Sequence, residues 1–142
     1  MTVEYKFLNV SNNQELNSDL IKSPPRVIFG DMSYYYTIMM VDVDYPTMSN
    51  NIESPYLQWM IVNNFKNTYR EENVVFPYYT PNPPSKTGYH RYVVCIYKQK
   101  NFIKAEEITN LNLERKKFKL EEFVKQFNLD LIKSKYFKVK KD

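Results

Sequence analysis

The segment Gly88-Tyr89-His90-Arg91-Tyr92 lies between a proline-rich stretch and an apolar run at residues 93–97. His90 is the only histidine in the chain, and Gly88 is one of two glycines. An imidazole titrates closest to neutrality, so it can donate to an anion or transfer a proton. Glycine permits a backbone geometry, or a close approach, that a Cβ atom forbids. The segment therefore predicts a turn that leads into a strand, with a histidine at the point of entry.

The hydrophobic pattern on either side of this segment predicts further strands. They are expected at residues 26–29, 37–41, 56–62 and 89–99. In the run at 37–41 every residue after Thr37 is apolar, which is typical of a central strand covered on both faces. Residues 76–87 contain too many prolines for a helix or an interior strand, and we expect an ordered surface loop there.

One amphipathic helix is predicted near the C-terminus. Apolar residues at 120, 123, 124 and 127 follow the i, i+3, i+4, i+7 spacing of a helix that packs one face on a core. The pattern has no repeating alternation of strand and helix. The fold class is therefore predicted as mainly β, two packed antiparallel sheets in a β-sandwich with a few peripheral helices. A mass of 17.2 kDa fits a single domain over residues 1–142.

Composition excludes several classes of protein. Cys95 is the only cysteine, so an internal disulfide and a cysteine-based zinc site are ruled out. No apolar stretch approaches the roughly 20 residues of a membrane-spanning helix. The first residues lack the pattern of a secretory signal, and we expect a cytoplasmic protein. The scarcity of Ala and Gly beside abundant Lys, Asn, Tyr and Ile suggests an AT-rich genome, such as that of a parasite or a large DNA virus.

Charge is unevenly distributed along the chain. Residues 27–65 contain four acids and no Lys or Arg, whereas residues 131–142 contain five lysines and one acid. A basic tail of this kind can contact the phosphates of nucleic acid or membrane. It is more often a solvated terminus, which is the interpretation favoured here. Nucleic-acid binding through the basic tail is the less favoured alternative.

Two carboxylates at the end of the predicted central strand are candidates for chemistry. Asp42 and Asp44 are two residues apart, so in a strand both would face one pocket. A metal site would need further His or Cys ligands, and the spacing matches no recognised calcium loop. A hydrolase would need a nucleophile, and no serine lies in a Gly-x-Ser-x-Gly elbow. The remaining option is a rigid cup around a small anion, in which the acids orient His90.

Three blocks of the sequence together resemble a known family. Asp42-Val43-Asp44-Tyr45-Pro46 is similar to the Asp-Pro-Asp-x-Pro signature of the phosphatidylethanolamine-binding proteins, which include Raf kinase inhibitor proteins and plant flowering-time regulators. Residues 56–63, Tyr-Leu-Gln-Trp-Met-Ile-Val-Asn, resemble the next block, Tyr-Leu-His-Trp-x-Val-x-Asn. Pro83-Pro84 with residues 88–93 resembles Pro-Pro…Gly-x-His-Arg-Tyr-Val. The order and separation of the blocks also fit.

The resemblance implies two packed antiparallel sheets with a small pocket at one end, which in the family holds phosphate-bearing head groups. Members are mostly regulatory and bind kinases or other proteins, so the resemblance implies no catalytic residue, no cofactor and no metal. Carried over position by position, the implied ligand-binding residues are Asp42, Asp44, Pro46, Tyr56, Gln58, Pro84, Gly88, His90 and Tyr92. The resemblance also implies cis peptide bonds at Ser54–Pro55 and Tyr45–Pro46.

The chain departs from the family pattern at three positions. Val43 replaces the proline between the acids, and Asn82 replaces a glycine before the proline pair. Gln58 replaces a histidine of the pocket and can donate a hydrogen bond without a charge. Because charge-assisted bonds are about twice as strong as neutral ones, anion affinity is expected to be reduced.

Two functions remain open from the sequence. The first is a non-enzymatic regulatory or scaffold protein that binds phosphate or a phospholipid head group weakly and also binds a protein partner such as a kinase. The alternative is a structural component of a larger assembly, such as a viral one, that keeps the fold and has lost ligand binding. Gln58 and Asn82 favour the alternative, whereas intact Asp42, Gly88 and His90 favour the first.

Overall fold

A computed structural model describes all residues from 1 to 142. In chain order the strands are β1 (Thr2–Tyr5), β2 (Leu8–Asn9), β3 (Gln14–Glu15), β4 (Arg26–Ile28), β5 (Tyr36–Asp42), β6 (Tyr56–Asn64), β7 (Val74–Phe76), β8 (His90–Lys98) and β9 (Asp130–Val139). The α-helices are α1 (Ala105–Thr109) and α2 (Leu120–Gln126), and short 3-10 helices cover Ser18–Leu20 and Glu71–Asn73.

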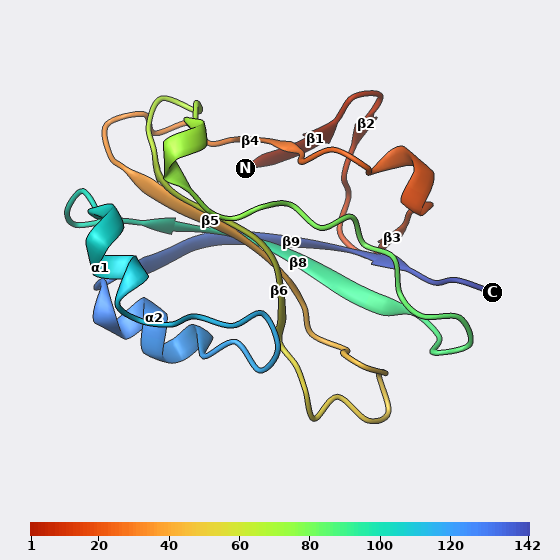
Figure 1. Ribbon diagram of the computed structural model, residues 1–142. Coiled ribbons are helices and arrows are strands. Elements are labelled where there is room, and N and C mark those ends of the chain that lie inside the picture. Colours follow the sequence, from red (N-terminus) through yellow and green to blue (C-terminus); the bar gives the residue numbers. More distant parts are fainter.

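The strands form two sheets. The larger has six strands in the order β3-β9-β8-β5-β6-β7, and the smaller has three in the order β2-β1-β4. All pairings are antiparallel except the short parallel contact of β3 with β9. The smaller sheet covers one face of the larger, and α1 and α2 lie on the other (Figure 1). The predicted fold class, mainly β with two packed sheets and peripheral helices, is confirmed.

Strand β5 is the centre of the larger sheet. All seven of its residues are buried, as expected for an apolar strand that is covered on both faces. Its last residue, Asp42, pairs with Tyr56 at the start of β6 and with Tyr92 near the start of β8. Antiparallel pairing therefore brings the three sequence blocks, which are far apart along the chain, to one end of one sheet.

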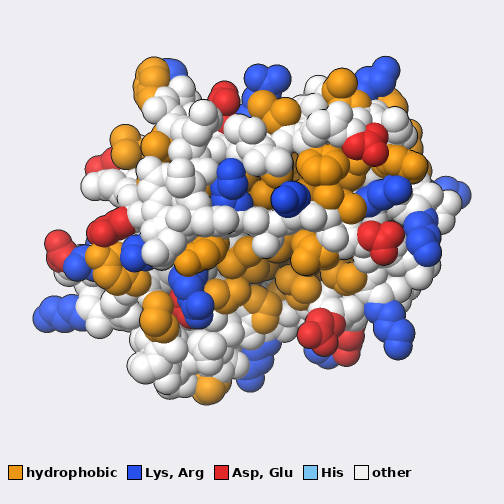
Figure 2. All heavy atoms as spheres, turned by 180° about the vertical axis from the view of Figure 1, so that it is seen from behind, with side chains coloured by type: hydrophobic (Ala, Val, Ile, Leu, Met, Phe, Trp, Pro, Cys, Tyr) orange, Lys and Arg blue, Asp and Glu red, His pale blue; other side chains and the backbone are white.

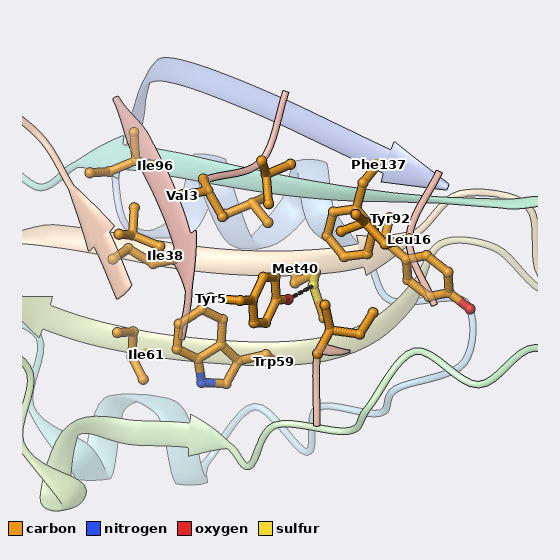
Figure 3. Packing of buried hydrophobic residues seen from close by; sticks show 14 of the residues in the cluster. Val3, Tyr5, Leu16, Ile38, Met40, Trp59, Ile61, Tyr92, Ile96 and Phe137 are labelled. Carbon is orange, nitrogen blue, oxygen red and sulfur yellow. Dashed lines mark hydrogen bonds between the residues drawn. The ribbon is translucent and has the colours of Figure 1, made fainter. Parts of the chain in front are cut away.

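The core between the two sheets is rich in aromatic side chains. Tyr5 of β1 points toward Met40 of β5, and Trp59, Tyr92 and Phe137 surround this contact from neighbouring strands (Figure 3). The rings of Tyr92 and Phe137 stack with their centroids 5.7 Å apart. Aromatic side chains bury large areas and prefer such offset contacts. Several of the aromatic residues of the sequence therefore pack in the layer between the two sheets.

The opposite face of the larger sheet packs against the C-terminal helices. Helix α2 confirms the helix predicted from the apolar spacing. Its Phe123 is buried in a second hydrophobic core, which lies between the larger sheet and the helices. Cys95 is also buried in this layer, where burial raises the pKa of its thiol to about 11. A thiol with this pKa remains protonated near neutral pH and acts as an apolar packing group.

The expectation that residues 131–142 form a solvated basic tail is wrong for most of the segment. Strand β9 pairs with β8 along its whole length, from Lys98↔Asp130 to His90↔Val139. Phe137 and Val139 are buried, and the lysines on either side of Val139 point away from the core between the sheets. Alternation with period two is the strand signal, and the lysines of this strand obscured it by making the composition resemble that of a terminus.

Candidate functional site

His90 is buried at the start of β8, and both of its ring nitrogens have hydrogen-bond partners within the chain. Nδ1 lies 2.6 Å from Oδ2 of Asp42, at the end of β5. Nε2 lies 2.9 Å from the hydroxyl oxygen of Thr87, and that hydroxyl donates to the carbonyl oxygen of Pro84 at 2.7 Å. The side chains of His90 and Asp42 are 0% and 3% exposed, so water does not reach this contact.

The hydrogen bond of Thr87 to Pro84 determines which group donates between Thr87 and His90. A threonine hydroxyl has one hydrogen, and when it donates to Pro84 it can only accept from His90. Nε2 then carries a hydrogen and donates to Thr87, while a second hydrogen lies between Nδ1 and the Asp42 carboxyl group. The arrangement thus holds His90 and Asp42 as a buried hydrogen-bonded pair.

Asp44 is compensated separately, by Arg91. One carboxylate oxygen of Asp44 accepts from the backbone N–H of Arg91 at 2.8 Å and from its Nε at 2.9 Å, and the other accepts from a terminal guanidinium nitrogen at 2.8 Å. Burial opposes the charged form of Asp44, but the hydrogen bonds from Arg91 outweigh burial and lower the pKa of this carboxyl below its ordinary value. The same bonds raise the pKa of Arg91.

Strand alternation does not place Asp42 and Asp44 on one face, as the sequence argument assumed. Asp42 is the last residue of β5, whereas Asp44 lies beyond the strand, where strand alternation no longer applies. The main chain turns after Asp42, with the Asp44 N–H donating to Oδ1 of Asp42 at 2.8 Å. One acid consequently binds His90 and the other binds Arg91 on the adjacent residue.

Tyr92 connects the site to the core. Its ring stacks on the His90 ring at 6.4 Å and on Phe137 at 5.7 Å. Burial and the nearby Asp42 carboxylate raise the pKa of the Tyr92 hydroxyl well above its ordinary value, so Tyr92 remains a neutral donor at physiological pH.

Tyr56 and Gln58 lie at the start of β6, where Tyr56 pairs with Asp42. The Gln58 side chain donates from Nε2 to the carbonyl oxygen of Tyr79 at 3.1 Å, and the backbone carbonyl oxygen of Gln58 accepts from the Tyr79 backbone N–H at 2.9 Å. The half-buried Tyr56 ring lies 4.8 Å from the Tyr45 ring, and burial raises the pKa of Tyr56. Gln58 is therefore already used in an internal contact.

Three of the expected ligand-binding residues, Pro46, Pro84 and Gly88, lie in the turns on either side of His90 and Asp42. Pro46 is half-buried, and Pro84 and Gly88 are exposed. Gly88 has φ +77°, a conformation that side chains with a Cβ rarely adopt. The backbone N–H groups of Gly88 and Tyr89 donate to no backbone carbonyl. The predicted cis bonds at Tyr45–Pro46 and Ser54–Pro55 are both present.

The main cavities of the molecule lie elsewhere. The largest of these, about 780 Å³, lies between residues 111–119, the turn at Ile52 and Glu53, and helix α2. None of the four main cavities is lined by Gly88, His90 or Tyr92. No group of three or more His, Cys, Asp or Glu side chains is placed to hold a metal ion, and no helix is long and apolar enough to cross a membrane.

Sequence reasoning missed three residues that shape the site. Thr87 caps the second nitrogen of His90, and its place three residues after Pro84 was the available signal for a side chain that bonds back to the turn. Arg91 belongs to the Gly88–Tyr92 segment, but its ion pair with Asp44 was not predicted. Arg115 donates to the carbonyl oxygens of Leu57, Gln58 and Pro77 and lies 3.4 Å from the Tyr79 ring centroid; no local pattern predicts such contacts.

Comparison with known proteins gives a consistent result. Residues 9–137 match the family described as phosphatidylethanolamine-binding protein. The chain is 33% identical over 97 residues to a 26 kDa secreted antigen of Toxocara canis, covering 66% of the chain and 37% of the antigen. It is 37% identical over 94 residues to the protein BROTHER of FT and TFL 1 of Arabidopsis thaliana, covering 64% of the chain and 52% of that protein. These matches thus span about half of each relative or less.

Solved structures share the fold. A carboxypeptidase Y inhibitor, crystallised with its cognate proteinase, superposes with a TM-score of 0.78 at 18% sequence identity, covering 99% of this chain and 82% of the inhibitor. At this identity the likeness concerns the arrangement of the strands and helices.

Proposed function

Since the chain belongs to the phosphatidylethanolamine-binding protein family, we propose that it binds a small phosphate-bearing anion between the Asp42–Pro46 turn and the Pro84–His90 loop. It acts as a regulatory or scaffold protein with a protein partner. The observation that carries the proposal is the buried His90, held as a hydrogen-bond donor by Asp42 on one side and Thr87 on the other.

Charge compensation supports an anion as the ligand. A buried carboxylate would repel a phosphate, but Asp42 is paired with His90 and Asp44 with Arg91. Lys138 and Lys140 lie 5.1 and 4.9 Å from the Tyr89 ring centroid, beside the loop that carries Gly88. The surroundings of the site are therefore positive on balance, which favours an anion.

The anion takes the place of the Thr87 hydroxyl. Nε2 of His90 points to Thr87, so an anion that replaces this contact accepts the same hydrogen. The unpaired backbone N–H groups of Gly88 and Tyr89 supply further donors from the adjoining loop. The exchange costs one internal hydrogen bond, so the affinity for free phosphate is weak.

We expect a charged donor at position 58 to strengthen binding. Gln58→His adds a cation at acidic pH, and a charge-assisted bond is worth about 1 kcal/mol more than a neutral one, or roughly fivefold in affinity. Isothermal titration calorimetry with inorganic phosphate at pH 6 measures the change. Gln126→His, on the exposed face of α2, is the control. An equal gain in both variants would contradict the proposed place of Gln58.

We expect no turnover of phosphate esters, amides or phospholipids. Asp42 and His90 form an acid–imidazole pair, but Thr87, the hydroxyl beside His90, already donates to Pro84. If the pair were catalytic, removing either member would lower the rate by orders of magnitude. Hydrolysis that is robust in the wild type and lost in both Asp42→Asn and His90→Ala would overturn the non-enzymatic assignment.

One observation favours a second candidate, a structural component of a larger assembly. Both ring nitrogens of His90 already have partners within the chain, so the site is complete without a ligand. In this case the protein partner carries the function and phosphate does not bind. The phosphate titration separates the two candidates.

A further inference from the structure

Large apolar side chains are exposed at several places on this surface. Figure 2 shows hydrophobic side chains gathered on the rear face, with charged side chains of both signs among and around them. The exposed large residues also include a group from three separate segments: Met32, Tyr34, Tyr35, Phe65 and Phe102, between 36% and 51% exposed. We call this group the aromatic patch.

Three members of the aromatic patch, Tyr35, Phe65 and Phe102, contact one another. The Tyr35 ring centroid lies 5.2 Å from that of Phe65 and 5.4 Å from that of Phe102. Tyr34 lies beneath Nζ of Lys98, 3.5 Å from the ring centroid, and Nζ of Lys66 lies 5.4 Å from the Phe65 centroid. Scattered exposed apolar residues are ordinary, but a contiguous group indicates an interaction site.

A buried polar network holds the three segments together. The Gln99 backbone N–H donates to the carbonyl oxygen of Tyr35 at 2.9 Å. Its side-chain amide donates to Oδ1 of Asn63 at 2.9 Å and to the carbonyl oxygen of Asn101 at 3.0 Å, and its Oε1 accepts from Thr37 at 2.9 Å. Fully satisfied buried networks rigidify the elements that they join. The aromatic patch is thus a fixed surface, built on the ends of β6 and β8 and the start of β5.

Ring geometry distinguishes between possible partners. Single-stranded nucleic acid needs free ring faces on which bases can stack. Lys98 occupies a face of Tyr34, and Tyr35 packs against Phe65 and Phe102. These contacts leave fewer free ring faces for bases, and two ammonium groups lie beside the rings. Aromatic side chains with nearby lysines are typical of surfaces that bind at a bilayer interface. There the ring enters the head-group region and the ammonium group contacts lipid phosphate.

We propose that the aromatic patch docks on the surface of a bilayer that contains anionic phospholipid. Lys66 and Lys98 supply the positive charge that complements anionic lipid. Asp31, next to Met32 of the patch, offsets part of this charge. Docking is peripheral: the side chains enter the head-group region and no element crosses the bilayer. The patch lies at the opposite end of β5 from Asp42, seven residues away, so the candidate anion site faces away from the lipid. The proposal is therefore independent of phosphate binding at His90.

Cosedimentation with vesicles of phosphatidylcholine and phosphatidylserine at 70:30 tests the proposal. The double variant Phe65→Ser/Phe102→Ser removes two apolar side chains, and we expect its partition coefficient to fall at least tenfold. The control is Phe7→Ser, which removes an isolated side chain that is 87% exposed and also has a lysine beside its ring; its binding should equal that of the wild type. Lys66→Gln should weaken binding about fivefold, since each lysine near an anionic surface contributes about 1 kcal/mol.

Three results would overturn the proposal. The first is wild-type protein that remains in the supernatant at all lipid concentrations. The second is an equal loss in the Phe7 control, which would indicate non-specific adsorption. The third is self-association of the wild type that the double variant abolishes while vesicle binding is absent, because the occupant would then be a second copy of the chain. Near-UV circular dichroism of each variant confirms that the fold is kept, and Tyr34→Ser provides a separate probe of the same patch.

Discussion

Arg91→Leu will destabilise the protein more than Asp44→Asn, although the two residues form one ion pair. Asp44 is completely buried, whereas the Arg91 side chain is 47% exposed. Without Arg91, a buried carboxylate keeps only its bond from the backbone, and breaking a buried pair in this way costs about 3–5 kcal/mol. Without the Asp44 charge, the guanidinium is hydrated in place, and we expect a loss of about 1–2 kcal/mol.

The pH dependence of this difference has a defined sign. Arg91 lowers the pKa of Asp44 in the folded state, so the stability from the pair is complete above the unfolded pKa of about 3.9 and is lost as the pH falls through the lower folded pKa. In Arg91→Leu, burial without a partner raises the folded pKa of Asp44. The variant therefore regains stability as the pH falls through that raised value, and its deficit relative to the wild type shrinks toward acid pH.

Urea denaturation of the two single variants and the double variant, at pH 7 and pH 3, measures these effects. Arg26→Leu, an exposed arginine on β4, is the control and should change the free energy of unfolding by less than about 0.5 kcal/mol. The double variant should lose less than the sum of the single variants, because the two side chains interact directly. Equal losses for Arg91→Leu and Asp44→Asn, unchanged between the two pH values, would contradict this description of the pair.

Phe137→Ala should lower the free energy of unfolding as much as a large-to-small substitution in the centre of the sheet does. Phe137 is 0% exposed and packs between Tyr92 and Tyr5. Removing a buried phenyl ring leaves a cavity and costs about 3–5 kcal/mol. Leu131→Ala in the same strand is the matched control, because Leu131 is 56% exposed, and it should cost less than about 1 kcal/mol.

Thermal and urea unfolding of the two β9 variants decide whether the C-terminal segment belongs to the core. We expect a large loss of unfolding free energy for Phe137→Ala and little change of it for Leu131→Ala. If both variants unfold like the wild type, residues 130–139 behave as the solvated terminus that their composition suggests, and the pairing of β9 with β8 is wrong.

Much of the fold could be predicted from local sequence. The apolar run at residues 37–41 indicates a central strand, and the spacing of Leu120, Phe123 and Phe127 indicates helix α2. Both signals arise because one residue pattern determines the burial of a whole element. That the block with His90 and the block with Asp42 meet at one end of the sheet was implied by the family resemblance and not by a local pattern.

The remaining features depend on contacts that no local pattern encodes. Strand β9 reads as a basic tail because its lysines alternate with only two fully buried residues, Phe137 and Val139. The partner of Asp44 was not predictable, since strand periodicity ends at Asp42 and the turn geometry decides where the next acid points. Thr87 becomes part of the site only through a turn that brings its hydroxyl to His90.

The central claim is that a phosphate-bearing anion binds at His90. Titration of isotopically labelled protein with inorganic phosphate, followed by two-dimensional NMR against sodium chloride at equal ionic strength, tests it most directly. We expect saturable shifts of the Gly88 and Tyr89 amide signals and of the His90 ring signals with phosphate alone, while the amide of Phe7, far along the chain from the site, does not move. If the signals of Gly88, His90 and Tyr92 stay in place at every phosphate concentration, or move equally with chloride, the site binds no phosphate and the claim is wrong.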